Sequence, residues 1–170
     1  MTLFPGGFGT LDEGFEVLTL MQTGKARIIP LVLVDRPGGS HWKTFMGFLH
    51  DYLLKAGLVS EDDFKLFSIT DDVDAAVAEI MQFYKNFRSY RWVGDRMVIR
   101  MKQTLTPAAL RDLNSRFADV LAEGVIEQGR ALPAEQNEPD ILDLPRLILT
   151  ARRSNFGRLR ELIDGVNQAV

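Results

Sequence analysis

Residues 2–34 read TLFPGGFGTLDEGFEVLTLMQTGKARIIPLVLV, and this alternation of apolar, glycine-rich and amphipathic stretches indicates the fold. Residues 2–4 predict a short strand that leads directly into the glycine-rich stretch 5–10. The residues that follow place apolar side chains at helical spacing, and Gly24 is positioned to end that helix. The continuous apolar run 28–34 is typical of a strand that is buried on both faces. The sequence therefore predicts a strand, a helix and a second strand in succession.

Further helices and a further strand continue the same alternation. Pro30 has no N–H to donate, so we place it near the start of the second strand or at a bulge. A second helix with apolar residues at helical spacing is closed by Gly57, and residues 65–69 predict a third strand. The third helix is predicted to bury an apolar face made of Val73, Val77, Ile80 and Tyr84. This βαβαβα order predicts an α/β fold with part of a Rossmann-like parallel sheet.

The second half of the chain has a different pattern, which predicts a small α+β appendage of order βαββα. Its elements are a strand with Met97, Ile99 and Met101 on one buried face, a helix after Thr106-Pro107, strands near 125–128 and 147–150, and a last helix over 159–166. The acidic stretch 133–145 lies between prolines, so we expect a solvated loop there.

The charge balance also changes between the two halves. Residues 1–85 contain seven lysines and arginines against twelve aspartates and glutamates, whereas residues 86–170 contain thirteen against eleven. This shift predicts two domains: a Rossmann-like half-domain over 1–85 that binds a nucleoside monophosphate, and an α+β extension over 86–170.

The composition excludes several classes of site. With 46% hydrophobic and 25% charged residues, the chain has the composition of a globular protein. It has no cysteine and only two histidines, His41 and His50, so a thiol nucleophile is excluded and no metal site is expected. No apolar run is long enough to span a membrane, and no signal peptide precedes the first strand, so we expect a cytoplasmic protein.

The stretch 5–13, PGGFGTLDE, carries the chemistry. Its glycines let the backbone approach a ligand closely, and the start of the helix adds unpaired N–H groups and a positive dipole end. These features favour a bound phosphate. The structural alternative is a tight turn in which Thr10 and Glu13 form a capping box, and the residues alone do not decide between the two.

The same stretch resembles the PGG-x-GT-x-x-E motif of the Lonely Guy (LOG) family, formerly called possible lysine decarboxylases. The resemblance continues through GFEVLTLMQTGK, IIPLVLV and KAGLV and covers about residues 1–85, while residues 86–170 resemble the C-terminal extension of larger bacterial members. It implies a Rossmann-like homodimer or higher oligomer that hydrolyses the N-glycosidic bond of a nucleoside 5′-monophosphate, such as AMP or a cytokinin ribotide. It implies no cofactor.

By this resemblance, Gly6, Gly7, Gly9 and Thr10 hold the 5′-phosphate and Glu13 is the catalytic carboxylate. Breaking the bond builds positive charge on the ribose, which a nearby carboxylate stabilises. We expect Glu13 in the first turn of the helix, where the dipole favours its ionised form, and Asp12 to point about 100° away.

The chain differs from the family at one point. Members carry an earlier βαβ half, with its own glycine-rich turn and a helix with an Arg-Lys pair, whose arginine works with the motif glutamate. None of this precedes Pro5 here, so we expect that the chain lacks the N-terminal half of a longer protein and is poorly active alone.

Two alternatives remain at this stage. The glycine loop could bind a nucleotide phosphate without turnover, for lack of that arginine. The stretch 85–102 contains six basic residues interleaved with aromatic ones, so it could bind RNA. We favour a linker with docked aromatic rings for this stretch, because a net charge of +2 over residues 86–170 is low for a nucleic-acid binder.

Overall fold

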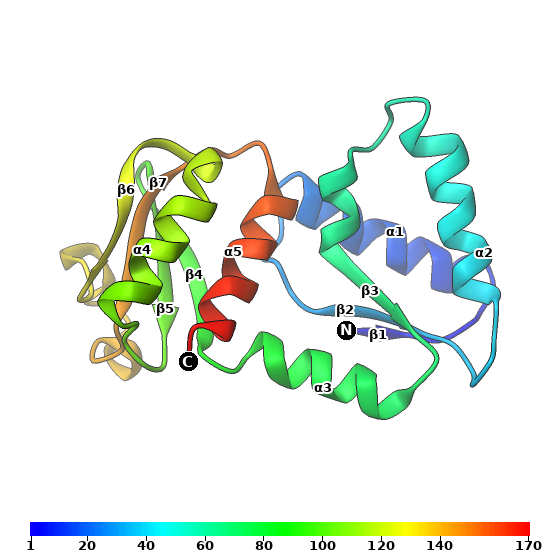
Figure 1. Ribbon diagram of the computed structural model, residues 1–170, viewed down its shortest axis with the longest axis horizontal. Helices are drawn as coiled ribbons and strands as arrows, with labels where there is room; N and C mark the ends of the chain where they lie inside the picture. The colour runs from blue at the N-terminus through cyan, green and yellow to red at the C-terminus, as the bar shows by residue number, and fades with distance from the viewer. The chain divides into compact units, whose positions relative to one another are not determined.

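The computed structural model describes residues 1–170 and confirms a mixed α/β fold with one parallel and one antiparallel sheet (Figure 1). The chain divides into two compact units. Unit 1 comprises residues 1–82 and 154–160, and unit 2 comprises residues 83–153 and 161–170.

Unit 1 is built on a three-stranded parallel sheet of order β1-β2-β3. Its elements are β1 (Thr2–Leu3), α1 (Phe8–Gln22), β2 (Leu31–Val34), α2 (His41–Phe48), the π-helical turn η1 (Leu49–Leu54), the 3₁₀ helix η2 (Glu61–Leu66), β3 (Phe67–Thr70) and α3 (Val73–Phe83). The predicted βαβαβα order is confirmed. Pro30 immediately precedes β2, where its missing N–H costs no ladder hydrogen bond.

The two faces of this sheet are covered by different helices (Figure 1). All four residues of β2 are buried. Leu31 and Leu33 line a small cavity together with residues of α1 and α2, whereas Val32 and Val34 pack against α3. Because side chains alternate along a strand, α3 lies on the face opposite α1 and α2.

The predicted buried face of α3 is confirmed only at Ile80, which packs against the buried side chains of Val32, Val34 and Ala76. Val73 and Val77 are 59% and 53% exposed, Met81 is 68% exposed, and the buried side instead holds Ala76 and Phe83. The helix carries apolar residues on both sides, so its periodicity alone could not identify the side that meets the sheet.

Unit 2 contains a four-stranded antiparallel sheet of order β4-β5-β7-β6. Its strands and helices are β4 (Phe87–Val93), β5 (Arg96–Met101), α4 (Pro107–Arg116), β6 (Leu121–Gly129), β7 (Arg146–Ala151) and the larger part of α5 (Phe156–Gln168); short 3₁₀ helices lie at η3 (Ala118–Val120), η4 (Pro133–Glu135) and η5 (Pro139–Ile141). The predicted start of α4 is confirmed, since the Thr106 hydroxyl accepts a hydrogen bond from the Ala109 N–H.

The interpretation of 85–102 as a linker is wrong. Residues 87–101 form the hairpin β4–β5, which turns at Gly94 with a positive φ of 59°. Residues 97–101 are buried throughout, not on one face only, because the segment 133–145 and helices cover opposite sides of β5.

The expectation of a solvated loop at 133–145 is wrong for Glu135 and Glu138, whereas Asp140 and Asp143 are exposed as expected. Glu135 is completely buried, and its carboxylate accepts hydrogen bonds from Arg100 Nε at 2.9 Å and Arg146 Nε at 3.2 Å. Glu138 bridges Arg91 and Arg100 at 2.6 and 2.7 Å. Glu135 and Glu138 therefore anchor this segment to arginines of the sheet. No helix has both the length and the apolar character needed to cross a membrane.

Candidate functional site

The glycine-rich loop between β1 and α1 presents an uncapped helix start. Helix α1 begins at Phe8, two residues before Thr10, and its N-cap is Gly7, which has no side chain to bond the first amides. The first intrahelical bond runs from the Leu11 N–H to the Gly7 carbonyl at 3.2 Å, so the preceding amides have no acceptor within the helix. Residues 6–9 are exposed. The loop therefore offers several N–H donors to an anion at one place.

The three glycines of the loop have different surroundings. A Cβ on Gly6 would lie 2.2 Å from the Thr10 hydroxyl oxygen, so only glycine lets the Thr10 side chain fold back over the loop. A Cβ on Gly7 or Gly9 would meet no atom within 4 Å. Gly7 and Gly9 thus face open space beside the amides, and Thr10 places a hydroxyl next to them.

The capping-box alternative for Thr10 and Glu13 is wrong. Thr10 is already the third residue of α1, so it is not the N-cap. Glu13 is the sixth residue and lies in the second turn, and the first turn contains no acidic residue. The expected help from the helix dipole also fails, because that effect falls off within the first turn.

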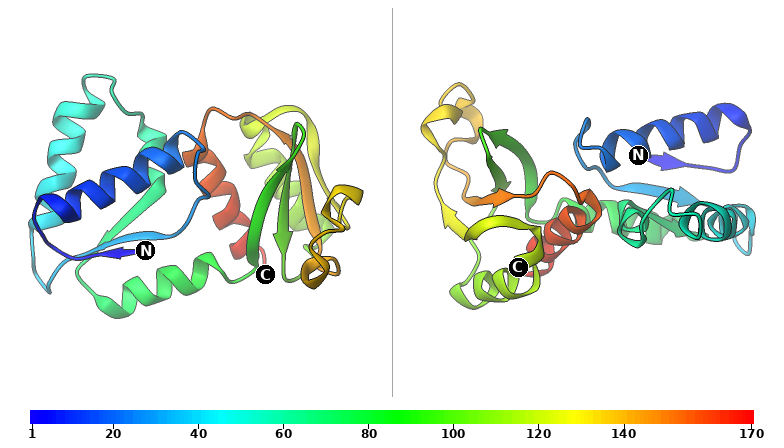
Figure 2. Two further views of the ribbon diagram at one scale, coloured as in Figure 1. Left: turned by 180° about the vertical axis from the view of Figure 1, so that it is seen from behind. Right: turned by 90° about the horizontal axis from the view of Figure 1, so that it is seen from above.

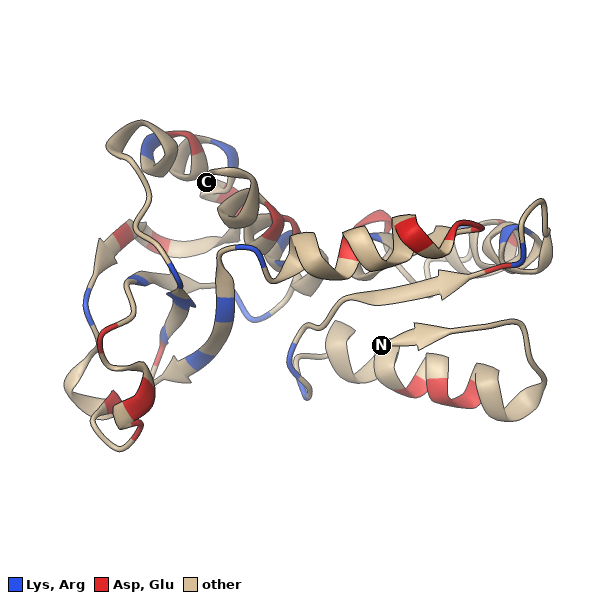
Figure 3. Ribbon diagram, turned by 90° about the horizontal axis from the view of Figure 1, so that it is seen from below, with Lys and Arg blue, Asp and Glu red and all other residues tan.

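Glu13 nevertheless shares a helix face with Gly9. Residues four apart on a helix lie one above the other, and side chains lean toward the N-terminus, so the exposed Glu13 side chain extends over the bare backbone of Gly9. Asp12 shares its face with Phe8 instead. Helix α1 contains three acidic residues and no basic one (Figure 3).

A second turn meets this loop at the carboxyl ends of the strands. The chain leaves β1, β2 and β3 at the same end of the sheet, as both the front and back views show (Figures 1 and 2). Thr10 and Leu11 of α1 and Trp42 and Phe45 of α2 line one cavity of about 10 Å³, so the first turns of the two helices are neighbours. Ligands of open α/β sheets bind at this edge.

Backbone bonds to carboxylates fix the turn between β2 and α2. The buried Asp35 carboxylate accepts hydrogen bonds from the N–H groups of Arg36 at 2.9 Å and Trp42 at 3.3 Å. A Cβ on Gly39 would lie 2.1 Å from Asp35 Oδ1, so that position requires glycine. The Gly38 N–H donates to Asp71 Oδ2 at 3.0 Å. This turn was not predicted from the sequence as part of a site, although its second Pro-Gly-Gly after a parallel strand was a signal for it.

The remaining polar candidates of unit 1 are Ser40, His41 and His50, and none of the three has a hydrogen-bonded partner that would orient it for catalysis. His41 opens α2, is exposed, and packs edge-on against the Trp42 ring at 4.7 Å. His50 lies exposed in η1, and Ser40 is the N-cap of α2 without a side-chain bond. No group of three or more histidine, cysteine, aspartate or glutamate side chains could hold a metal ion.

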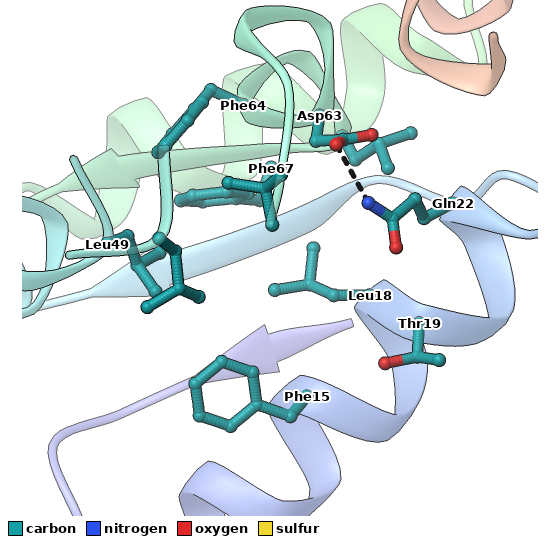
Figure 4. Close-up of a pocket in the computed structure, with 11 residues that line it drawn as sticks. Phe15, Leu18, Thr19, Gln22, Leu49, Asp63, Phe64 and Phe67 are labelled. Carbon is teal, nitrogen blue, oxygen red and sulfur yellow. Dashed lines mark hydrogen bonds between the residues drawn. The ribbon is translucent and has the colours of Figure 1, made fainter. Parts of the chain in front are cut away.

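A larger, apolar pocket of about 180 Å³ lies beside the second half of α1 (Figure 4). Phe15, Leu18 and Phe67 are among its apolar walls, and its polar rim is closed by a 2.7 Å hydrogen bond from Gln22 Nε2 to Asp63 Oδ2. The glycine loop precedes the other end of the same helix. This pocket is therefore separate from the candidate site.

Comparison with known protein families gives a match for the segment that contains the candidate site. Residues 1–80 match the sequence profile of the family described as "Possible lysine decarboxylase", which is the LOG family. Over these residues the chain is similar to this family. The match spans the glycine loop, α1 and the β2–α2 turn, and it confirms the resemblance seen in PGGFGTLDE. No curated protein matches the chain.

The LOG family points to a nucleotide phosphoribohydrolase or a related hydrolase or lyase-like enzyme. The older decarboxylase label calls for a desolvated lysine that could form a Schiff base. Every lysine within the matched residues is exposed: Lys25, Lys43, Lys55 and Lys65. None of these four lysines has the burial that such a Schiff-base residue needs.

Proposed function

We propose that the chain belongs to an enzyme that hydrolyses the N-glycosidic bond of a nucleoside 5′-monophosphate. Water adds to the anomeric carbon of the ribose, the bond to the base breaks, and the free base leaves with a proton while ribose 5-phosphate remains. The observation that carries the proposal is the LOG-family motif placed on an exposed, uncapped helix start at the carboxyl edge of a parallel sheet.

The glycine loop supplies the phosphate site in this proposal. Backbone amides of Gly7 and Gly9 donate hydrogen bonds to the phosphate oxygens, and the Thr10 hydroxyl adds another donor. Gly6 allows Thr10 to reach that position, because a larger residue would collide with its hydroxyl. The open space beside Gly7 and Gly9 lets a phosphate come close to the backbone.

Glu13 is the catalytic carboxylate of the proposal. It projects from the face of α1 that holds Gly9, so it extends from the second turn toward the ligand bound at the first. There its negative charge stabilises the positive charge that develops on the ribose as the base departs, or orients the attacking water. Asp12 projects from the neighbouring face and takes no part.

A non-catalytic phosphate-binding module is the second candidate. It is favoured by the absence of any basic residue from the glycine loop and α1, since Glu13 then has no cationic group beside it on its own element. An RNA-binding role for 85–102 has less support, because Phe87 and Tyr90 are buried and Arg91 and Arg100 are paired with Glu138.

The test uses the full chain with AMP, and the products are separated by liquid chromatography. Release of adenine together with ribose 5-phosphate supports hydrolysis, and adenosine, which lacks the phosphate, should not be cleaved. Binding of ribose 5-phosphate, measured by calorimetric titration, without release of adenine would favour the binding module. If the chain neither binds ribose 5-phosphate nor releases adenine, the proposal is overturned.

A further inference from the structure

The turns that follow β1 and β2 carry the same Pro-Gly-Gly sequence, at residues 5–7 and 37–39. The two strands are parallel neighbours, with Leu3 opposite Leu33. Gly6 follows β1 by three residues and Arg36 follows β2 by two, so both lie in the turns that leave these neighbouring strands at the same edge of the sheet. The small cavity shared by Thr10 and Trp42 shows that the helices after the two turns also begin side by side.

Arg36 is the only basic residue in the three loops at this edge of the sheet. Those loops are residues 4–7, 35–40 and 71–72. The Arg36 guanidinium is exposed and forms no ion pair or hydrogen bond in the structure. A single unpaired cation therefore stands at the edge where the candidate phosphate site lies.

The carboxylates nearby are already engaged by backbone donors. Asp35 accepts from two N–H groups, Asp71 accepts from the Gly38 N–H at 3.0 Å, and Asp72 accepts from the Asp74 N–H at 2.8 Å. These bonds fix the backbone of the turn that carries Arg36, and none of the three carboxylates pairs with its guanidinium. The Arg36 side chain is therefore available to a ligand.

We propose that Arg36 is a phosphate-binding residue of this site, donated by the strand next to the glycine loop; the inference rests on the proposed function. A phosphate monoester is a dianion, whereas the loop offers only neutral amides and α1 adds three acidic residues. The planar guanidinium donates two parallel hydrogen bonds to phosphate oxygens and balances their charge. Arg36 thus fits the phosphate end of the ligand and not its base.

The test measures the affinity of the full chain for ribose 5-phosphate and for ribose by calorimetric or NMR titration. Arg36→Gln should weaken binding of ribose 5-phosphate at least about tenfold, because it removes a charged pair of hydrogen bonds, and Arg36→Lys, which keeps the charge, should lose less. Arg27→Gln is the matched control: Arg27 is also exposed and lies before the other end of β2. It should bind ribose 5-phosphate like the unmodified chain. Binding of ribose should not change in any variant.

Three results would overturn the inference, and they can be distinguished. If the unmodified chain binds ribose 5-phosphate and Arg36→Gln binds it equally well, Arg36 is not a ligand, while the proposed function stands. Arg36 is equally excluded as a ligand if Arg27→Gln weakens binding as much as Arg36→Gln, because net charge alone then explains the loss. If the unmodified chain binds no ribose 5-phosphate, the proposed function and the role of Arg36 both fail. Thermal unfolding of each variant verifies that these exposed substitutions leave the fold intact.

Discussion

At Gly9, helix stability and ligand binding make opposite demands. Alanine favours a helix by up to about 1 kcal/mol over glycine, and a Cβ at Gly9 would meet no neighbouring atom. Gly9→Ala should therefore leave the unfolding temperature unchanged or raise it. The same methyl group would stand where the phosphate approaches the backbone, so the affinity for ribose 5-phosphate should fall. Thermal melts and titration of the same sample separate the two effects.

Gly47 provides the control for this substitution. It lies in α2, is exposed, and also has open space around its missing Cβ. Gly47→Ala should stabilise the chain in the same way and leave binding unchanged. If Gly9→Ala also left binding unchanged, the glycines of the loop would serve only the turn.

The carboxylate of Glu13 should matter for turnover and not for binding. The carboxylate acts on charge that is present only in the transition state, so its removal should lower kcat. In a form of the enzyme that releases adenine from AMP, Glu13→Gln should abolish release and leave nucleotide affinity nearly intact. Asp12→Asn, one residue away on another face of α1, should retain activity. Equal losses in both variants would contradict the assignment.

Within unit 2, the decisive contacts join the segment 133–145 to the sheet. Glu135, Arg100 and Arg146 are all buried, and Arg146 also donates hydrogen bonds to the carbonyls of Leu144 and Ile141 at 2.6 and 2.8 Å. Removing one member of a buried ion pair leaves its partners uncompensated, at a cost of about 3–5 kcal/mol. Glu135→Gln should destabilise unit 2 by that order in denaturant unfolding. Glu138→Gln, at a partly exposed site, should cost clearly less.

The same cluster makes unit 2 sensitive to acid. Burial raises the pKa of Glu135, but the Leu132 amide and the guanidinium groups of Arg146 and Arg100 outweigh it and hold the pKa below its ordinary value of 4.5. Because the folded-state pKa is the lower one, the stabilisation is complete above pH 4.5 and is lost as the pH falls through the folded-state pKa. Unfolding free energies measured between pH 3 and pH 6 (a range of about 1.5 units on either side of the ordinary pKa) should show this loss. The Glu135→Gln variant should show less of it.

These elements show which parts of the fold local sequence predicts. The parallel strands were predictable, because β2 is a continuous apolar run and Pro30 marks where it begins. Strand β4 was not, because its sequence FRSYRWV mixes charges with aromatic residues and contains a bulge between Phe87 and Ser89. The burial of Glu135 depends on Arg100, 35 residues away in the chain, and no local pattern reveals such a partner.

In the candidate site, too, local sequence predicts some features and not others. PGGFGTLDE was sufficient to locate the loop and Glu13, because the motif is contiguous. The start of α1 was misplaced, because a helix whose N-cap is glycine has no capping side chain to mark it. Arg36 was missed because it joins the site only when β1 and β2 pair.

On the scale of the whole molecule, unit 1 has exposed apolar side chains whose contact with water is unfavourable. Val73, Val77 and Met81 form a stripe on α3, with the small residues Ala75 and Ala78 nearby on the exposed surface of the helix. Phe48 and Tyr52 stack at 5.4 Å in a second exposed group on α2 and η1. The strand order also leaves β1 and β3 at the edges of the sheet. Exposed apolar faces and free strand edges both favour association between chains.

We therefore expect the chain to form homodimers or larger assemblies, and the stripe on α3 to contribute to them. Val77→Glu places a charge in the middle of that stripe, so it should shift the equilibrium toward the monomer, as measured by sedimentation equilibrium over a range of concentrations. Val125→Glu is the matched control, because Val125 is 58% exposed on β6 of unit 2 and undergoes the same substitution. It should not change the assembly. An unmodified chain that stays monomeric at all concentrations would contradict the prediction, and equal effects of the two substitutions would show that added charge, and not the α3 stripe, controls association.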